Sequence, residues 1–226
     1  MTTRPEPMAD VRDMYMAHTM FRREFGLVPG LVRRVAEGDG ERSEIVGAHL
    51  DLLCRILHAH HEGEDIIVWP KLHERGGHAA AEIVLTMEWQ HHAVEKTLER
   101  LGVVLPGWRA TARGGAQVAE TCDDLNILLA EHMALEEKEI LPLAARFITA
   151  AEWKGLGEHG MNSFSKKELA LAFGLVMYEA DPDVIKGVLA HAPFPARLLI
   201  PRIAPRIFAA HAERVHGTAT PPRWNR

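Results

Sequence analysis

Apolar residues recur along most of this chain at the three- and four-residue spacing of a helix, and the strict alternation of a half-buried strand is nearly absent. Long helices are predicted over residues 10–37, 41–75, 79–104 and 115–148. Glycine occurs in every break between them. Long helices joined by short links predict an all-α fold, an up-down antiparallel four-helix bundle.

Shorter helices are predicted beyond this region. Thr149 with Glu152, and Ser165 with Glu168, form capping-box patterns, and Asp181 precedes a proline suited to the first position of a helix. We therefore expect a bundle domain over residues 1–150 and a C-terminal helical extension over residues 151–226.

The extension carries the opposite charge to the rest of the chain. From residue 193 onward there are six Arg and one Glu, whereas the whole chain has a net charge of −5. We expect this tail to dock on its own acidic bundle. Contact with a membrane surface or an acidic partner is the alternative.

Several classes of protein do not fit this composition. The acidic net charge disfavours nucleic-acid binding, and the first residues, MTTRPEPMAD, form no secretory signal. The longest apolar run, Leu169 to Met177, is shorter than the roughly 20 residues that a membrane-spanning helix needs. We expect a cytoplasmic protein that binds neither nucleic acid nor membrane, and the sequence indicates no particular protein partner.

Histidine is unusually frequent, with 14 residues against two tyrosines, which suggests metal ligands. An HxxxE motif with a proline ten residues after its histidine occurs twice, and the second copy follows the first by 72 residues. A single histidine upstream of each motif is displaced by 73 residues. This pattern predicts a helical hairpin used twice. Its polar residues are His18, His60, Glu64, His91, His132 and Glu136.

Helical geometry, at about 100° per residue, selects the motif that faces the core. His60 and Glu64 lie on the apolar stripe of the second predicted helix. The rival pair, His58 and Glu62, lies on the opposite side. We therefore reject the rival pair as metal ligands.

Neighbouring polar residues are assigned by the same geometry. His61 and Asp65 lie at the edge of the stripe, where we expect them to support the ligands or to face solvent. On the third predicted helix the stripe carries His91 and Glu95 rather than His92. Glu95 is therefore added as a candidate ligand that binds metal directly or hydrogen-bonds to a metal-bound water, a solvated glutamate being the alternative.

Burying an unpaired carboxylate or imidazole costs several kcal/mol, so these inward-facing groups need partners. A buried ion pair is the simpler explanation of one HxxxE motif. Four histidines and at least two glutamates are better explained by a pair of metal ions bridged by Glu64 and Glu136. Mixed imidazole and carboxylate ligands suit iron, manganese or zinc.

These residues, in this order and spacing, resemble the hemerythrin family, in particular the bacterial hemerythrin-like HHE cation-binding domains. The resemblance covers about residues 10–150. It implies a non-haem centre of two iron ions, with Glu64 and Glu136 bridging and the histidines as terminal ligands. It also implies a small diatomic molecule or peroxide as the ligand.

The sequence departs from the oxygen-carrying members of that family, which have five histidines, with HxxxH on the third helix and HxxxxD on the fourth. Here the third helix offers His91 with Glu95, and Glu136 follows His132 at a shorter spacing. An anionic ligand in place of a neutral one favours ferric iron, which disfavours reversible carriage of dioxygen.

We therefore expect reaction with hydrogen peroxide, nitric oxide or dioxygen, catalase-like turnover being the enzymatic form. Whether the chain is an enzyme stays open at this stage. The alternatives are a module that binds or senses oxygen, nitric oxide or iron, and an iron donor for iron-sulfur repair. Near His18, we expect Arg22 to pair with a bridging carboxylate and Tyr15 to hydrogen-bond a bound ligand, an ordinary packing or salt-bridge role being the alternative for both.

Overall fold

The structure is a computed structural model that describes residues 6–162, 164–190, 192 and 194–224. Within these ranges the fold is all-α, as predicted, and contains no strand beyond an isolated bridge between Met8 and Thr149. The elements are α1 (Arg12–Arg33), α2 (Gly40–Gly63), the π-helix η1 (Glu64–Val68), α3 (Trp69–Arg75), α4 (Gly77–Thr111), α5 (Gly115–Leu135), the π-helix η2 (Glu136–Ile140), α6 (Leu141–Phe147), α7 (Ala150–Asn162), α8 (Lys166–Met177), α9 (Pro182–Ala190) and α10 (Phe194–His216).

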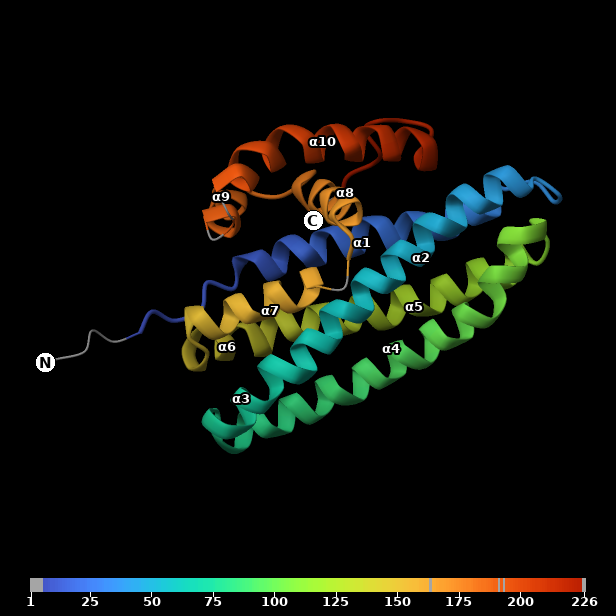
Figure 1. The fold of residues 1–226 in the computed structure, drawn as a ribbon. Helices are drawn as coiled ribbons and strands as arrows, with labels where there is room; N and C mark the ends of the chain where they lie inside the picture. The colour runs from blue at the N-terminus through green and yellow to red at the C-terminus, as the bar shows by residue number, and fades with distance from the viewer. Residues whose placement is uncertain (1–5, 163, 191, 193, 225–226) are drawn as a thin grey trace, which may run out of the picture.

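The first two thirds of the chain form four long helical arms, which Figure 1 shows lying side by side. The first arm is α1, the second α2–η1–α3, the third α4, and the fourth α5–η2–α6. The first and third arms each pack against the second and the fourth. This arrangement fits the predicted up-down bundle.

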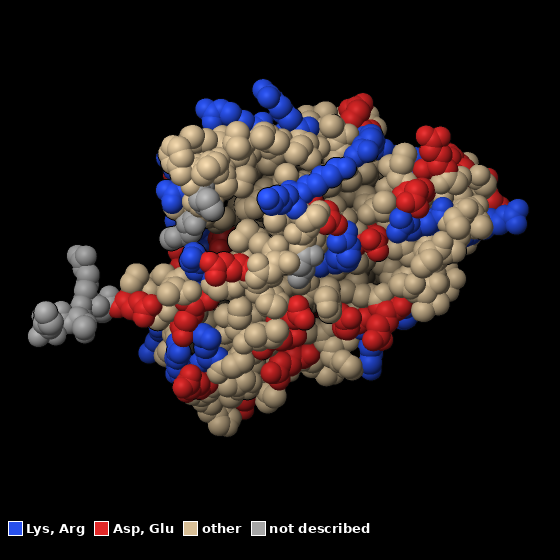
Figure 2. Space-filling view, in the orientation of Figure 1, with Lys and Arg blue, Asp and Glu red and all other residues tan. Residues whose placement is uncertain are grey.

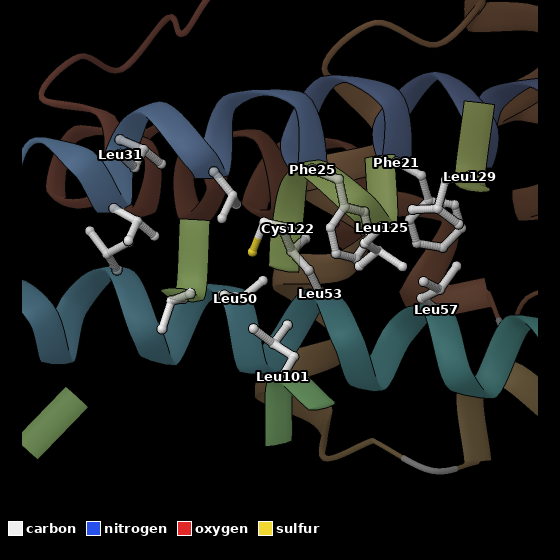
Figure 3. Packing of buried hydrophobic residues seen from close by; sticks show 14 of the residues in the cluster. Phe21, Phe25, Leu31, Leu50, Leu53, Leu57, Leu101, Cys122, Leu125 and Leu129 are labelled. Atoms are coloured by element: carbon white, nitrogen blue, oxygen red, sulfur yellow. The ribbon is translucent and has the colours of Figure 1, made fainter. Parts of the chain in front are cut away.

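Within the described residues, the arms enclose two clusters of buried apolar side chains, and part of the larger one is drawn in Figure 3. Each arm supplies apolar side chains at helical spacing, so that one stripe of every helix is removed from water. The labelled residues of this core are Phe21, Phe25, Leu31, Leu50, Leu53, Leu57, Leu101, Cys122, Leu125 and Leu129.

The helix ends follow the sequence signals except at the first and third arms; α1 ends at Arg33, four residues before the predicted end at residue 37. Asp39 caps α2 by accepting a hydrogen bond from the backbone N–H of Arg42, which explains the break before that helix. The third arm was predicted to stop at residue 104, and this boundary is wrong, because α4 continues through Pro106 to Thr111. The extra seven residues include Trp108, which is buried, and that apolar burial compensates for the hydrogen bond that proline cannot donate.

The extension begins with caps that the sequence predicted. Thr149 and Glu152 exchange the two hydrogen bonds of a capping box before α7, and Ser165 and Glu168 do the same before α8. Helix α9 begins at the proline after Asp181, as expected. The chain therefore encodes these short helices locally.

The extension lies against the bundle. Helix α8 packs on α1, and α10 packs on both α8 and α2 (Figure 1). Leu175 and Phe208 join the apolar core of the bundle. Arg42 donates hydrogen bonds to the backbone carbonyls of Arg214 and Val215. The basic tail thus lies against its own bundle, held by apolar contacts and by hydrogen bonds from the Arg42 side chain.

Charge is divided across the surface, as the sequence indicated. Figure 2 shows basic side chains along the top of the view, where α10 lies in Figure 1, and most of the acidic side chains of that face below them. Among the helices that the structure describes, none combines the length and apolarity needed to cross a membrane.

Candidate metal centre

Six of the seven predicted ligands come together inside the bundle. His18 comes from the first arm, His60 and Glu64 from the second, His91 from the third, and His132 and Glu136 from the fourth. Their side chains are almost completely buried, His60 being the most exposed at 14%. Every arm of the bundle therefore contributes to the cluster.

The potential ligand atoms form two adjacent groups. One group contains His61, Glu64, His91 and His132, and the other contains His18, His60 and Glu136. Within each group the ligand atoms lie within 4.8 Å of one another. Each group therefore has the compactness and the mixed imidazole and carboxylate composition of a site for one metal ion.

The two glutamates connect these groups. Glu64 places Oε1 3.2 Å from His60 Nε2 and Oε2 3.3 Å from His91 Nε2, so its two oxygens face histidines of different groups. Glu136 Oε2 lies 3.0 Å from His18 Nε2 and 3.7 Å from His132 Nε2. Both carboxylates thus occupy the position in which a bridging ligand would lie.

Each glutamate is the first residue of a π-helical segment. The backbone N–H of Trp69 donates to the carbonyl of Glu64, and that of Leu141 donates to the carbonyl of Glu136, both across five residues. Such segments are rare and occur often at functional sites. The two lie 72 residues apart, at 64–68 and 136–140, so the repeat seen in the sequence extends to the backbone conformation.

Many buried polar atoms of the cluster face one another at 3.0–3.7 Å but make no aligned hydrogen bond among the described residues. These atoms are Nε2 of His18, His60, His91 and His132, both carboxylate oxygens of Glu64, and Oε2 of Glu136. Unsatisfied buried polar atoms are rare in native proteins, and each costs about 1–3 kcal/mol. All seven point into one small region, and nitrogen and oxygen lone pairs are what a transition-metal ion requires. The residues present therefore fit metal ions.

Acidic residues outside the cluster orient two of the histidines. His91 donates from Nδ1 to Asp65 at 2.7 Å, and Asp65 also accepts from the indole N–H of Trp69. His18 donates from Nδ1 to Glu137 at 3.0 Å. A hydrogen bond at Nδ1 leaves Nε2 directed at the cluster, which is how metal-binding histidines are usually held.

The two residues near His18 take the alternative, ordinary structural roles rather than contacts to a bridging carboxylate or a bound ligand. Arg22 donates to Glu137 at 2.6 Å and so supports the partner of His18 rather than a bridging carboxylate. The Tyr15 hydroxyl donates to the backbone carbonyl of Glu137 at 3.4 Å. Both side chains lie near His18, as the sequence predicted, but Glu137 lay outside the predicted set.

In the metal-free cluster, some histidines have a raised pKa and others have a lowered one. Burial alone would lower the pKa of His18 and of His91, but the surrounding carboxylates raise both to about 9. Burial, with the neighbouring imidazolium groups, lowers the pKa of His60 and His132 to about 3. Burial and the charge of Glu136 raise the pKa of Glu64 to about 8.

Glu95 is not part of the cluster, and we remove it from the predicted ligand set. Its carboxylate lies at the surface, 46% exposed, where it contacts His58 Nδ1 at 3.2 Å. His58 itself is outside the cluster, as predicted. The helical wheel tests only direction around one helix, and it could not show that the residue one turn beyond His91 is already beyond the reach of the metal groups.

His61 is the residue that the sequence analysis underestimated. Its side chain is buried, and its ring stacks on His91 with 4.0 Å between the ring centres. His60 and His61 belong to different ligand groups, so one helix supplies a histidine to each group. The signal was present in the sequence as two adjacent histidines at the start of an HxxxE motif.

Comparison with known proteins gives one family. The model of the hemerythrin HHE cation-binding domain matches residues 9–144, which is more than half of the chain and includes all seven residues of the two ligand groups. Neither the curated proteins nor the solved structures gave a match. The matched region contains a repeated HxxxE motif, a buried histidine and carboxylate cluster, and an all-helical fold, and the chain belongs to the hemerythrin HHE cation-binding domain family.

Proposed function

We propose that this chain is a cytoplasmic, non-haem di-iron protein whose centre reacts with a small oxidant, namely hydrogen peroxide, nitric oxide or dioxygen. The observation that carries the proposal is Glu64, whose two oxygens face His60 in one ligand group and His91 in the other. A buried carboxylate in this position is suited to bridge two metal ions. The proposed ligands are His18, His60, His61, Glu64, His91, His132 and Glu136.

The family match supports metal binding, and the ligand types favour iron over calcium or a soft metal. Bound iron would supply an electron reservoir and an open position for a small ligand. The protein supplies the surroundings. Phe21 and Trp69 lie against the rings of His60 and His91, with 5.2 and 5.6 Å between ring centres, and help to exclude water from the centre.

A route for protons is present beside the first arm. Glu137 accepts a hydrogen bond from the buried His18, and its own side chain is 22% exposed. Arg22 holds this carboxylate in place. We propose that Glu137, rather than Glu95, passes protons between the centre and solvent when peroxide is turned over.

Reversible binding of the small ligand, in a carrier or sensor, is the second candidate function. With His61 the cluster contains five histidines and two carboxylates. The extra neutral ligand weakens the preference for ferric iron that Glu95 was expected to impose. The presence of His61 is therefore the specific observation that favours this second function.

One set of measurements distinguishes the two functions. The protein is loaded with iron, iron per chain is measured, and the reduced protein receives one equivalent of dioxygen before an argon purge. We expect about two irons per chain, an oxidised visible spectrum that persists through the purge, and oxygen evolution from added peroxide. Recovery of the reduced spectrum, with no oxygen evolution, would support reversible binding. A single iron per chain would reject the bridged centre.

Two variants make the assay specific. Glu136→Ala removes a proposed bridging ligand and should abolish both iron retention and oxygen evolution. His58→Ala changes an exposed histidine outside the cluster and should leave both unchanged.

We also propose how the chain is divided into regions. We assign residues 1–150 to an up-down antiparallel four-helix bundle that holds the centre, and residues 151–226 to a helical extension. The family match over residues 9–144 and the packing of the four arms support this division.

A further inference from the structure

A second cluster of metal-binding side chains lies away from the proposed iron centre. It consists of Glu24 in α1, His49 in α2 and His216 at the end of α10. Glu24 follows His18 by six residues, which is about 9 Å along α1 at 1.5 Å per residue, and the two sets share no residue. Only Glu24 and His49 lie in the region that the family model matches.

The cluster is compact and buried. Glu24 Oε2 lies 3.2 Å from His49 Nε2 and 3.2 Å from His216 Nε2, and the side chains are 0%, 0% and 4% exposed. These separations are close to the roughly 3.3 Å that ligand atoms at 2.0–2.1 Å from a tetrahedral metal ion would show. The geometry therefore needs little adjustment to hold an ion.

His49 shares one feature with the side chains of the proposed iron centre. Its Nε2 is buried and has no hydrogen-bond partner. Seven of the eight buried side-chain nitrogen and oxygen atoms found without a partner, over the described part of the chain, belong to the iron centre, and His49 Nε2 is the eighth. A nitrogen left bare in this way costs about 1–3 kcal/mol unless something binds it.

The surrounding hydrogen bonds orient His49 for a metal. His49 Nδ1 and His211 Nε2 lie 3.0 Å apart and share one proton in a hydrogen bond. If His49 carries that proton, its Nε2 presents a lone pair to the carboxylate of Glu24, and two acceptors at 3.2 Å repel unless a cation lies between them. In the other tautomer the Nε2–H has no acceptor in line. A cation bound to His49 Nε2 would remove the repulsion in the first of these two tautomers.

The other oxygen of Glu24 is already occupied. Arg23 Nε donates to Glu24 Oε1 at 2.7 Å, while Arg23 also pairs with Glu179 at 2.5 Å. One arginine thus balances two carboxylates in a buried site, which leaves one negative charge uncompensated. Either a divalent ion or a proton on a histidine could supply the missing positive charge.

We propose that Glu24, His49 and His216 form a second metal site, for a single divalent ion of the zinc type. Two imidazoles and one carboxylate are an established donor set for such ions, and the nitrogen ligands disfavour calcium and magnesium. Because His216 belongs to α10, the ion would fasten the extension to the first two arms of the bundle.

Zinc serves as the probe, with metal counted per chain after dialysis of the metal-free full-length protein. Wild type and the control His78→Ala, which changes an 88% exposed histidine, should each retain about one zinc more than His216→Ala. Equal zinc in wild type and a folded His216→Ala variant would overturn the proposal.

Wild-type crystals grown with zinc decide the matter if His216→Ala does not fold. An anomalous-scattering peak within bonding distance of Glu24 Oε2, His49 Nε2 and His216 Nε2 is expected, separate from the peaks of the iron centre. An empty cluster in that map would show that a proton, not a metal, supplies the missing charge, and would overturn the proposal.

Discussion

His91 donates a hydrogen bond from Nδ1 to Asp65, the residue that follows the glutamate of the first HxxxE motif, at 2.7 Å. His18 makes the equivalent contact with Glu137, the residue that follows the glutamate of the second motif. Each half of the repeat therefore orients the histidine of the other half. The acids beside the proposed ligands are as much part of the repeat as the ligands themselves.

Removing this contact should weaken metal binding without removing a ligand. In Asp65→Asn the anionic acceptor of His91 Nδ1–H is lost, so His91 is less basic and less well oriented. We expect metal affinity to fall about 10–100-fold, measured by competition with a chelator. Glu95→Gln, at an exposed acid outside the cluster, is the control. Equal losses in the two variants would show that the contact with Asp65 has no special role.

His61→Ala tests whether the fifth histidine is a ligand. We expect iron content to fall and the visible spectrum to shift, because His61 lies in the ligand group of Glu64, His91 and His132. The stacking of His61 on His91 provides a purely structural alternative. His61→Phe retains a ring in that position, so full iron content in this variant would mean that His61 only packs.

Glu136→Ala should destabilise even the metal-free protein. The pKa of His18 is raised to about 9, largely by the carboxylates that offset its burial, so His18 carries a charge at neutral pH. Removing Glu136 leaves that charge poorly compensated in the core and should cost about 3–5 kcal/mol in the free energy of unfolding. Denaturant unfolding measures the loss. Glu139→Ala, in the same motif but at a 42% exposed acid paired with Lys138, should change stability little.

Metal binding should become tighter as pH rises toward 9. Burial lowers and the carboxylates raise the pKa of His18 and His91, to a net value of about 9, while burial raises that of Glu64 to about 8. These raised pKa values mean that the metal-free cluster holds protons at pH 7, and an incoming ion must displace them. Affinity should therefore be weakest at low pH and should level off above pH 9.

Calorimetry in buffers of different ionisation enthalpy counts the displaced protons, and we expect about two to three per cluster at pH 7. His60 and His132, whose pKa values burial lowers to about 3, should release none. Metal binding at pH 7 without proton release would contradict the assigned protonation of the cluster.

Gly174→Ala tests how the extension docks on the bundle. A methyl group at Gly174 would lie 2.5 Å from the backbone carbonyl oxygen of Ala204 and 2.8 Å from Cβ of Phe208, so α8 and α10 would have to separate. We expect a loss of about 1–3 kcal/mol, measured by thermal unfolding. Gly187→Ala, where the added group meets open space, should instead stabilise its helix by about 0.5–1 kcal/mol. Similar effects at both positions would argue against tight packing of α8 on α10.

Most of the helices could be predicted from signals that lie within a few residues of one another in the sequence. Apolar spacing and caps predicted the helical arms and the helices of the extension, because those signals act within a few residues. The end of α4 was missed because the burial of Trp108 outweighs the effect of Pro106, and burial depends on distant parts of the chain. The tertiary context overrode a local signal at that point.

The candidate site was predicted at its centre and less well at its edges. The repeat identified His60, Glu64, His132 and Glu136 because the same spacing occurred twice. Glu95 was included wrongly because a helical wheel reports direction but not position along the bundle axis. The cluster at Glu24 was not predicted, since its third member belongs to the extension, almost the full length of the chain away.

The π-helical segments at Glu64 and Glu136 bear on the history of the chain. A turn closed across five residues holds one residue more than the α-helical turn it replaces, so each segment corresponds to a single-residue insertion in a plain helix. Both insertions lie at equivalent positions of the repeat, 72 residues apart. Two independent insertions at matching positions would be needed if the halves arose separately. A single insertion is enough if the hairpin was duplicated after it. If the repeat arose by duplication, the ancestral hairpin already carried this extra residue, and with it the backbone that presents the glutamate, before the two halves joined into one chain.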